Sequence, residues 1–203
     1  MVLVAPAAAA TQPVVLVVGD SLSAGYGLTI DENWPTRLEE RLAAAGRPHR
    51  VVNASISGDT TSGGLARLPG ALERLSPSIV LIGLGGNDGL RGIPTAEIRR
   101  NLSKMIQLSE SAGARVLLAG IHIPPNYGPR YTESFHAIYH ELSQEYGTGL
   151  IPFILEGVAL DVELMQDDGI HPNAAAQSVI VDNVWPALEP LLDLTMHNDT
   201  DQE

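Results

Sequence analysis

The chain has 203 residues, of which 44% are apolar and 18% are charged, and this size and composition predict a single globular domain. The formal net charge of −12 argues against a nucleic-acid partner and against binding to anionic membrane surfaces. No cysteine is present, which excludes disulfides, thiolate metal sites and a cysteine nucleophile.

Residues 1–12 differ from the rest of the chain. Residues 1–10 are apolar and end in small residues, as in the Ala-x-Ala pattern that precedes a signal-peptidase cleavage site. They lack a basic opening segment and therefore resemble the end of a signal peptide, which predicts an exported protein; the alternative is a disordered alanine-rich leader. No apolar run is long enough to span a bilayer, so we expect no stable membrane insertion.

From Pro13 onward, strand and helix patterns alternate. An apolar, β-branched run predicts a strand at 14–18, and apolar runs predict strands at 79–84 and 115–121. Short strands are expected at 50–54 and 150–153. Apolar residues at helical spacing predict helices at 34–45, 61–75, 95–112, 133–146 and 174–192. Glycines and Pro69 weaken the pattern of the helix at 61–75, and Pro186 is expected to interrupt the last helix. We assign 13–194 to one domain and 195–203 to a polar, disordered tail.

This alternation predicts a three-layer α/β/α sandwich around about five parallel strands. Sites in such sheets form beyond the carboxyl ends of the strands. Three polar segments directly follow predicted strands: Gly19-Asp-Ser21, Ser57-Gly58-Asp59 and Gly85-Gly-Asn-Asp88. We therefore expect all three segments at one edge of the sheet.

Ser21, His171 and Asp168 are candidates for a catalytic triad. Ser21 lies on a turn after a buried strand, although a lone serine of this kind is more often a helix cap, and the Gly-x-Ser-x-Gly elbow is absent. His171 precedes Pro172 and is expected on an extended loop, where it could act as a base. Asp168 is spaced to orient the imidazole, and Asp167 is an alternative with a less suitable spacing. Taken alone, Asp-x-x-His is better explained as a polar turn.

Acyl transfer also needs hydrogen-bond donors for the oxyanion. Gly58 could supply a backbone N–H and Asn87 a side-chain amide. Each has a simpler explanation, a positive-φ turn for Gly58 and an Asx-turn for Asn87.

A competing metal site has little support. His136 and His140 have the i, i+4 spacing that zinc can use, but His-Glu-x-x-His is absent and no third ligand is apparent. A surface pair is the favoured interpretation. No dinucleotide or Walker-type glycine loop is present, so we expect neither a metal nor a cofactor.

Four blocks of this sequence resemble those of the SGNH (GDSL) hydrolases: Gly19-Asp-Ser-Leu22, Ser57-Gly58-Asp-Thr, Gly85-Gly-Asn-Asp88 and Asp168-Gly-Ile-His171-Pro-Asn. The resemblance continues through longer blocks in the same order, at 52–60, 64–69, 84–92, 125–131 and 165–173, and spans roughly 14–192.

The resemblance implies a flavodoxin-like α/β/α fold and a cofactor-free serine hydrolase that cleaves carboxylic esters and thioesters of acyl chains. Ser21 would be the nucleophile, His171 the base and Asp168 its orienting partner. The Ser21 N–H, the Gly58 N–H and the Asn87 side chain would form the oxyanion hole. Substrate contacts would come from Gly89, Leu90, Arg91, Ile123 and Pro124. The family also implies a periplasmic or secreted bacterial protein, and we expect a monomer. The alternatives are a carbohydrate O-acetyl esterase and a binding module that has lost the chemistry.

Overall fold

The computed structural model of the protein describes residues 12–196. The predicted leader, apart from Gln12, and residues 197–203 of the predicted tail lie outside the described residues. The last helix runs to Met196, so the first two residues of the predicted tail are helical.

Five parallel strands form one sheet in the order β2-β1-β3-β4-β5. The strands are β1 (Val14–Gly19), β2 (Arg50–Asn53), β3 (Ile79–Gly83), β4 (Arg115–Ala119) and β5 (Gly149–Ile151). This is the strand order of flavodoxin-like doubly wound sheets. The predicted α/β/α architecture is therefore confirmed.

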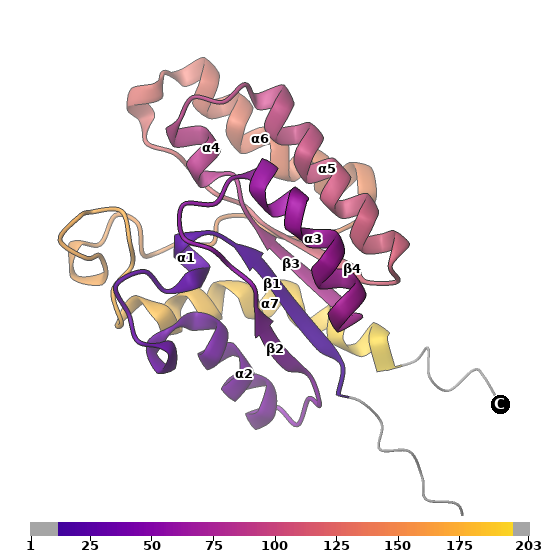
Figure 1. Ribbon diagram of the computed structural model, residues 1–203. Helices are drawn as coiled ribbons and strands as arrows, with labels where there is room; N and C mark the ends of the chain where they lie inside the picture. The colour runs from indigo at the N-terminus through magenta and orange to yellow at the C-terminus, as the bar shows by residue number, and fades with distance from the viewer. Residues whose placement is uncertain (1–11, 197–203) are drawn as a thin grey trace, which may run out of the picture.

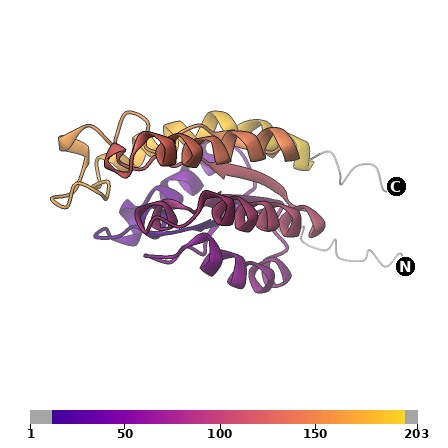
Figure 2. The same ribbon diagram turned by 90° about the horizontal axis from the view of Figure 1, so that it is seen from above.

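Helices cover both faces of the sheet, as Figures 1 and 2 show from two directions. The long helices are α2 (Trp34–Ala44), α3 (Thr61–Leu75), α5 (Thr95–Ser111), α6 (Pro129–Tyr146) and α7 (Ala176–Met196). The short elements are α1 (Ser21–Ala24), η1 (Ile30–Glu32), α4 (Gly86–Leu90), η2 (Pro125–Tyr127) and η3 (Val162–Leu164). Helices α3, α5 and α6 pack on one face, and α2 and α7 pack on the other.

Two hydrophobic clusters hold the layers together. Alternate residues of β1 point to opposite faces, so Leu16 and Val18 pack under α3 and α5 while Val15 and Val17 pack under α2 and α7. Every residue of β1 is buried. The strand that leads into Ser21 is therefore enclosed on both faces.

Two helix predictions were wrong in detail. Helix α7 is continuous, although it contains Pro186 and Pro190. Its buried residues, which include Ile180, Val184 and Leu188, face the core, and this packing outweighs the backbone hydrogen bonds that the prolines cannot make. Helix α6 begins at Pro129 rather than at 133, because proline is well suited to the first turn of a helix.

The connections that follow the carboxyl ends of the strands carry the polar motifs. Helices α1 and α4 lie directly beyond β1 and β3 at one edge of the sheet. The long connection from β5 to α7, orange in Figure 1, projects from the same edge. The expectation that the polar segments share one edge is confirmed by this topology.

Candidate active site

Ser21 is the first residue of α1, one turn of helix that directly follows β1. Asp20 caps this helix, since its Oδ1 accepts a hydrogen bond from Leu22 N at 3.1 Å. The N–H groups of a helix's first turn have no intrahelical acceptor. Ser21 therefore presents a half-buried hydroxyl at the edge of the sheet, together with a backbone N–H that has no acceptor among the described residues.

The structure brings Ser21 and His171 together across 150 positions of sequence. The distance between Ser21 Oγ and His171 Nε2 is 2.9 Å. His171 Nδ1 lies 2.7 Å from Asp168 Oδ2, which leaves Asp167 without a role in this chain of hydrogen bonds. The His171 side chain is 16% exposed, and the Asp168 side chain is 37% exposed.

Asp168 is locked to the backbone of its own turn. Its Oδ1 accepts hydrogen bonds from Ile170 N at 2.9 Å and His171 N at 3.0 Å. The hydrogen bond from the His171 side chain, followed by these two backbone bonds, lowers the pKa of Asp168 to about 2. The carboxylate is therefore ionised at neutral pH and favours a proton on Nδ1 of the imidazole.

The turn that carries His171 is hydrogen-bonded to the segment that follows α1. Gln166 N donates to His171 O at 2.8 Å, and Gln166 Nε2 donates to Pro172 O at 3.0 Å and to Tyr26 O at 2.7 Å. The rings of Tyr26 and His171 are 4.4 Å apart. These contacts hold the long β5–α7 connection against the residues that follow α1.

Gly58 and Asn87 lie in the connections that follow β2 and β3, the two strands that flank β1. Gly58 follows β2 with φ of 80°, a conformation that favours glycine. Within the described part of the chain its N–H has no acceptor, and its carbonyl accepts from Arg91 at 3.2 Å. Asn87 lies in α4, beyond β3, so the ends of three adjacent strands supply the candidate oxyanion donors.

Asp20 is a site residue that the sequence analysis missed. The residue is 2% exposed, and its Oδ2 accepts a hydrogen bond from Asn87 Nδ2 at 3.2 Å. Burial raises the pKa of Asp20 to about 6, against the opposing effect of the hydrogen bonds from Leu22 and Asn87. The available signal was an acidic residue placed directly after a wholly apolar strand.

The five predicted substrate residues divide between surface and core. Leu90 and Arg91 are exposed at the end of α4, and Pro124 is exposed at the start of η2. Ile123 is only 6% exposed and packs in the core. A Cβ atom on Gly89 would lie 2.7 Å from the Ile123 side chain, so these two residues touch and leave little surface for a ligand.

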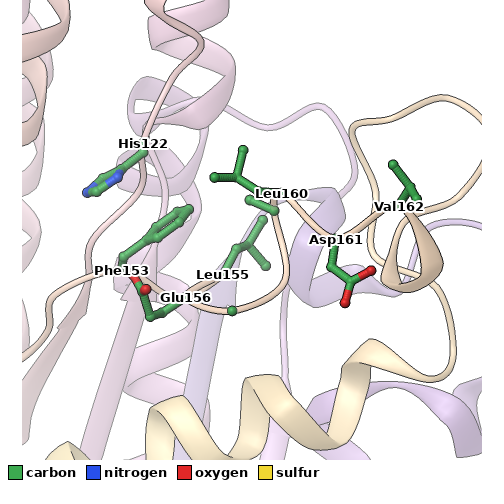
Figure 3. Close-up of a pocket in the computed structure, with 9 residues that line it drawn as sticks. His122, Phe153, Leu155, Glu156, Leu160, Asp161 and Val162 are labelled. Carbon is green, nitrogen blue, oxygen red and sulfur yellow. The ribbon is translucent and has the colours of Figure 1, made fainter.

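A cleft of about 640 Å³ lies next to this group and contains none of the five predicted substrate residues. Its walls come from His122 after β4 and from the β5–α7 connection, including Phe153, Leu155, Glu156 and Leu160 (Figure 3). His122 stacks on Phe153 at 4.1 Å and on His136 at 4.0 Å.

The predicted His136–His140 pair does not acquire further ligands. Among residues 12–196, no group of three histidine, aspartate or glutamate side chains is arranged to hold a metal ion. Burial lowers the pKa of His136, and the imidazole is involved in ring stacking with His122. Within the described residues, no helix is both long and apolar enough to cross a membrane.

Comparison with known proteins decides the family. The pattern of the GDSL-like lipase/acylhydrolase family matches residues 17–179. The chain belongs to this family. It is 54% identical over 177 residues to "Esterase TesA" of Pseudomonas aeruginosa, covering 87% of this chain and 88% of that protein. It is 46% identical over 184 residues to "Thioesterase 1/protease 1/lysophospholipase L1" of Escherichia coli K12, covering 91% of this chain and 87% of that protein.

Solved structures agree with the sequence relatives. A crystal structure of TesA has a TM-score of 0.86 at 53% identity, covering 88% of this chain and 99% of that one. The psychrotrophic esterase EstA from Pseudoalteromonas sp., inhibited by monoethylphosphonate, has a TM-score of 0.85 at 40% identity, covering 89% of this chain and 98% of that one. Membership of the family makes this chain a hydrolase.

Proposed function

We propose that this chain hydrolyses carboxylic esters and thioesters of acyl chains, with Ser21 as nucleophile, His171 as general base and Asp168 as its orienting partner. The observation that carries the proposal is the chain of contacts from Ser21 Oγ to His171 Nε2 at 2.9 Å and from His171 Nδ1 to Asp168 Oδ2 at 2.7 Å. The names esterase, arylesterase and thioesterase, given to its relatives, support the substrate class.

In the first half-reaction, Nε2 of His171 takes the hydroxyl proton of Ser21 as Oγ attacks the acyl carbonyl carbon. The ionised Asp168 stabilises the resulting imidazolium. The tetrahedral intermediate then collapses, the bond to the leaving oxygen or sulfur breaks, and His171 returns its proton to the leaving alcohol or thiol. The acyl group remains esterified to Ser21.

In the second half-reaction, His171 takes a proton from water, and the resulting hydroxide attacks the acyl-enzyme carbonyl. Collapse releases the carboxylic acid and returns the proton to Ser21 Oγ. Both tetrahedral intermediates carry an oxyanion, for which we propose three donors: the N–H groups of Ser21 and Gly58 and the side-chain amide of Asn87. The hydrogen bond from Asn87 to Asp20 supports this role, since it orients the amide group.

We propose that the acyl chain contacts Leu90, Arg91 and Pro124, with Gly89 and Ile123 forming the floor beneath them. The exposure of Leu90 beside polar oxyanion donors supports an acyl substrate over a sugar. A profile of p-nitrophenyl esters of increasing chain length tests this choice. Turnover of longer chains is expected, and strict preference for acetate would favour the carbohydrate O-acetyl esterase.

The decisive experiment is labelling with a fluorophosphonate, followed by intact mass and peptide mapping. We expect one adduct, on Ser21. The Ser21→Ala variant should remain folded, take up no label and lose about 10⁴-fold or more of its ester hydrolysis. An adduct on any other residue, or near-normal activity in Ser21→Ala, would overturn the proposed mechanism. A folded wild-type protein that takes up no label and cleaves no ester would support the binding module.

We further propose an exported monomer. One chain supplies every residue of the proposed mechanism, which supports a monomer, and light scattering during gel filtration tests it. Export rests on the small-residue pattern at 1–10, which lies outside the described residues. N-terminal sequencing of protein from the periplasmic fraction tests export, and an uncleaved cytoplasmic product would contradict it.

A further inference from the structure

The exposed large apolar side chains of this protein are gathered at one edge. Within residues 12–193, the part of the chain whose side-chain burial is described, they all lie in the five connections that follow the carboxyl ends of the strands, at 20–33, 54–60, 84–94, 120–128 and 152–175. They are Tyr26, Ile30, Ile56, Leu90, Tyr127, Leu160, Val162 and Ile170. We call these eight residues the apolar edge. Within the same range, the outer faces of the long helices and the connections leading into strands carry none.

The exposure of several of these residues exceeds what a bound acyl chain would need. Leu160 is 99% exposed, and Ile30 and Val162 are each 82% exposed. A side chain that is open on all sides is poorly placed to line a narrow binding site. Ile30 and Leu160 also belong to different connections, after β1 and after β5. Clustered apolar exposure of this kind marks a surface that contacts something larger than one small molecule.

The apolar edge is continuous with the proposed catalytic residues. Tyr26 is 52% exposed, and its ring lies 4.4 Å from that of His171. Ile170, which is 54% exposed, directly precedes His171. A partner or surface that bound to the apolar edge would therefore contact the protein at the entrance to the proposed active site.

The same five connections are strongly acidic. They contain ten aspartate and glutamate residues, of which Asp20 and Asp88 are buried and Asp59 is paired with Arg67, and one arginine, Arg91. Acidic residues adjoin the most exposed apolar ones. Asp31 follows Ile30, and Asp161 lies between Leu160 and Val162 in the sequence, three residues that Figure 3 labels. The described connections leading into strands contain no acidic residue. The edge thus combines apolar side chains with negative charge, which repels anionic head groups and attracts cationic ones.

We propose that the apolar edge docks on the surface of a phosphocholine-headed micelle or bilayer. The cationic ammonium groups lie outermost on such a surface, where the carboxylates of the edge can attract them. The acyl chains lie beneath, where the side chains of Ile30, Leu160 and Val162 can contact them. A protein partner seated on this edge would cover Ser21, whereas a lipid surface brings acyl esters to it. The choice of lipid over protein therefore rests on the proposed function.

The test is co-flotation of the full chain with vesicles of dialkyl-ether phosphocholine, which contain no cleavable ester. Wild type is expected to float with these vesicles and not with dialkyl-ether phosphatidylglycerol vesicles at low salt. Ile30→Asp and Leu160→Asp should each weaken binding by roughly ten- to a hundredfold, because a charge replaces a buried apolar side chain. Pro48→Asp adds the same charge in the exposed α2–β2 connection at the opposite edge and should bind like wild type.

All three variants are expected to hydrolyse p-nitrophenyl acetate, a soluble substrate, at the wild-type rate, which verifies folding. The proposal is overturned if wild type does not float with phosphocholine vesicles or floats equally with anionic ones. It is also overturned if Leu160→Asp weakens binding and Ile30→Asp does not, because the cleft in Figure 3 would then be the binding site. Self-association that both edge variants abolish, without vesicle binding, would identify a second copy as the occupant.

Failure of docking and failure of the proposed function are distinguishable. Ether-lipid flotation requires no chemistry at Ser21, and fluorophosphonate labelling requires no lipid. Labelling at Ser21 without flotation would support the proposed esterase function and contradict the proposed lipid docking. Flotation without labelling would support docking and contradict the esterase function.

Discussion

The proposed site contains two carboxylates whose environments are opposite. Asp20 follows a strand buried on both faces and is 2% exposed, whereas Asp168 lies on a projecting connection with its side chain 37% exposed. Burial raises the pKa of Asp20 to about 6, and the hydrogen bond from His171 lowers the pKa of Asp168 to about 2.

The difference separates two tasks. Asp168 stays ionised at neutral pH, as the partner of a histidine that becomes positively charged must. Asp20 is bonded to Leu22 N and to the Asn87 amide, so it organises α1 and the proposed oxyanion donor instead of interacting directly with the base. Asp168 is therefore suited to stabilising the charge on His171, and Asp20 is suited to positioning Asn87.

The largest effect is expected at the exposed carboxylate. Asp168→Ala should lower kcat by about 1000-fold or more, because His171 loses the group that fixes its tautomer and stabilises its charge. Asp167→Ala removes the adjacent exposed carboxylate and should leave kcat unchanged. Steady-state hydrolysis of a p-nitrophenyl ester measures both, and an equal loss in the two variants would contradict the assignment of Asp168.

Asn87→Ala comes next. Loss of one oxyanion donor is expected to lower kcat by about 100- to 1000-fold while KM changes little, because the oxyanion forms only in the transition state. Thermal unfolding should show that the variant is folded. A rise in KM at unchanged kcat would instead place Asn87 among groups that bind the ground state.

Asp20→Ala should lower kcat by roughly tenfold or more, and this loss should depend on Asn87. In an Asn87→Ala background, Asp20→Ala is expected to add less than about threefold, because its target is already absent. Asp20→Asn retains an oxygen acceptor and should recover part of kcat. Full additivity of the two alanine variants would show that Asp20 acts independently of Asn87.

The last effect is on stability, and its sign is opposite to that on activity. Because the pKa of Asp20 rises from 3.8 to about 6, the folded protein above pH 6 holds a charge that the unfolded chain solvates better. Asp20→Asn should therefore be more stable than wild type at pH 8, by up to about 3 kcal/mol.

This stability difference should shrink as the pH falls below about 6 and vanish only below the unfolded pKa of 3.8, where both states of wild type hold the proton. Urea denaturation at pH 8 and pH 4.5 measures it. A difference that does not change with pH would mean that burial of the Asp20 charge is not its cause.

The sequence by itself determined much of this protein. The runs at 14–18 and 79–84 are apolar and rich in β-branched residues, so their strands were predictable. The alternation of strands with helices was enough to predict a parallel sheet. That topology in turn predicted one edge for Ser21, Gly58 and Asn87. The helix at 61–75 was predicted with its exact bounds, although it contains Pro69.

Tertiary structure decided the features that depend on contacts between distant residues. Helix α7 continues through Pro186 because its inner face is packed in the core, which local propensity does not include. The choice of Asp168 over Asp167 depends on where the turn points each carboxylate. Asp20 becomes a buried partner of Asn87, 67 positions away in sequence, only because β1 and β3 are neighbours in the sheet. Burial and its effect on the pKa exist only once the chain has folded.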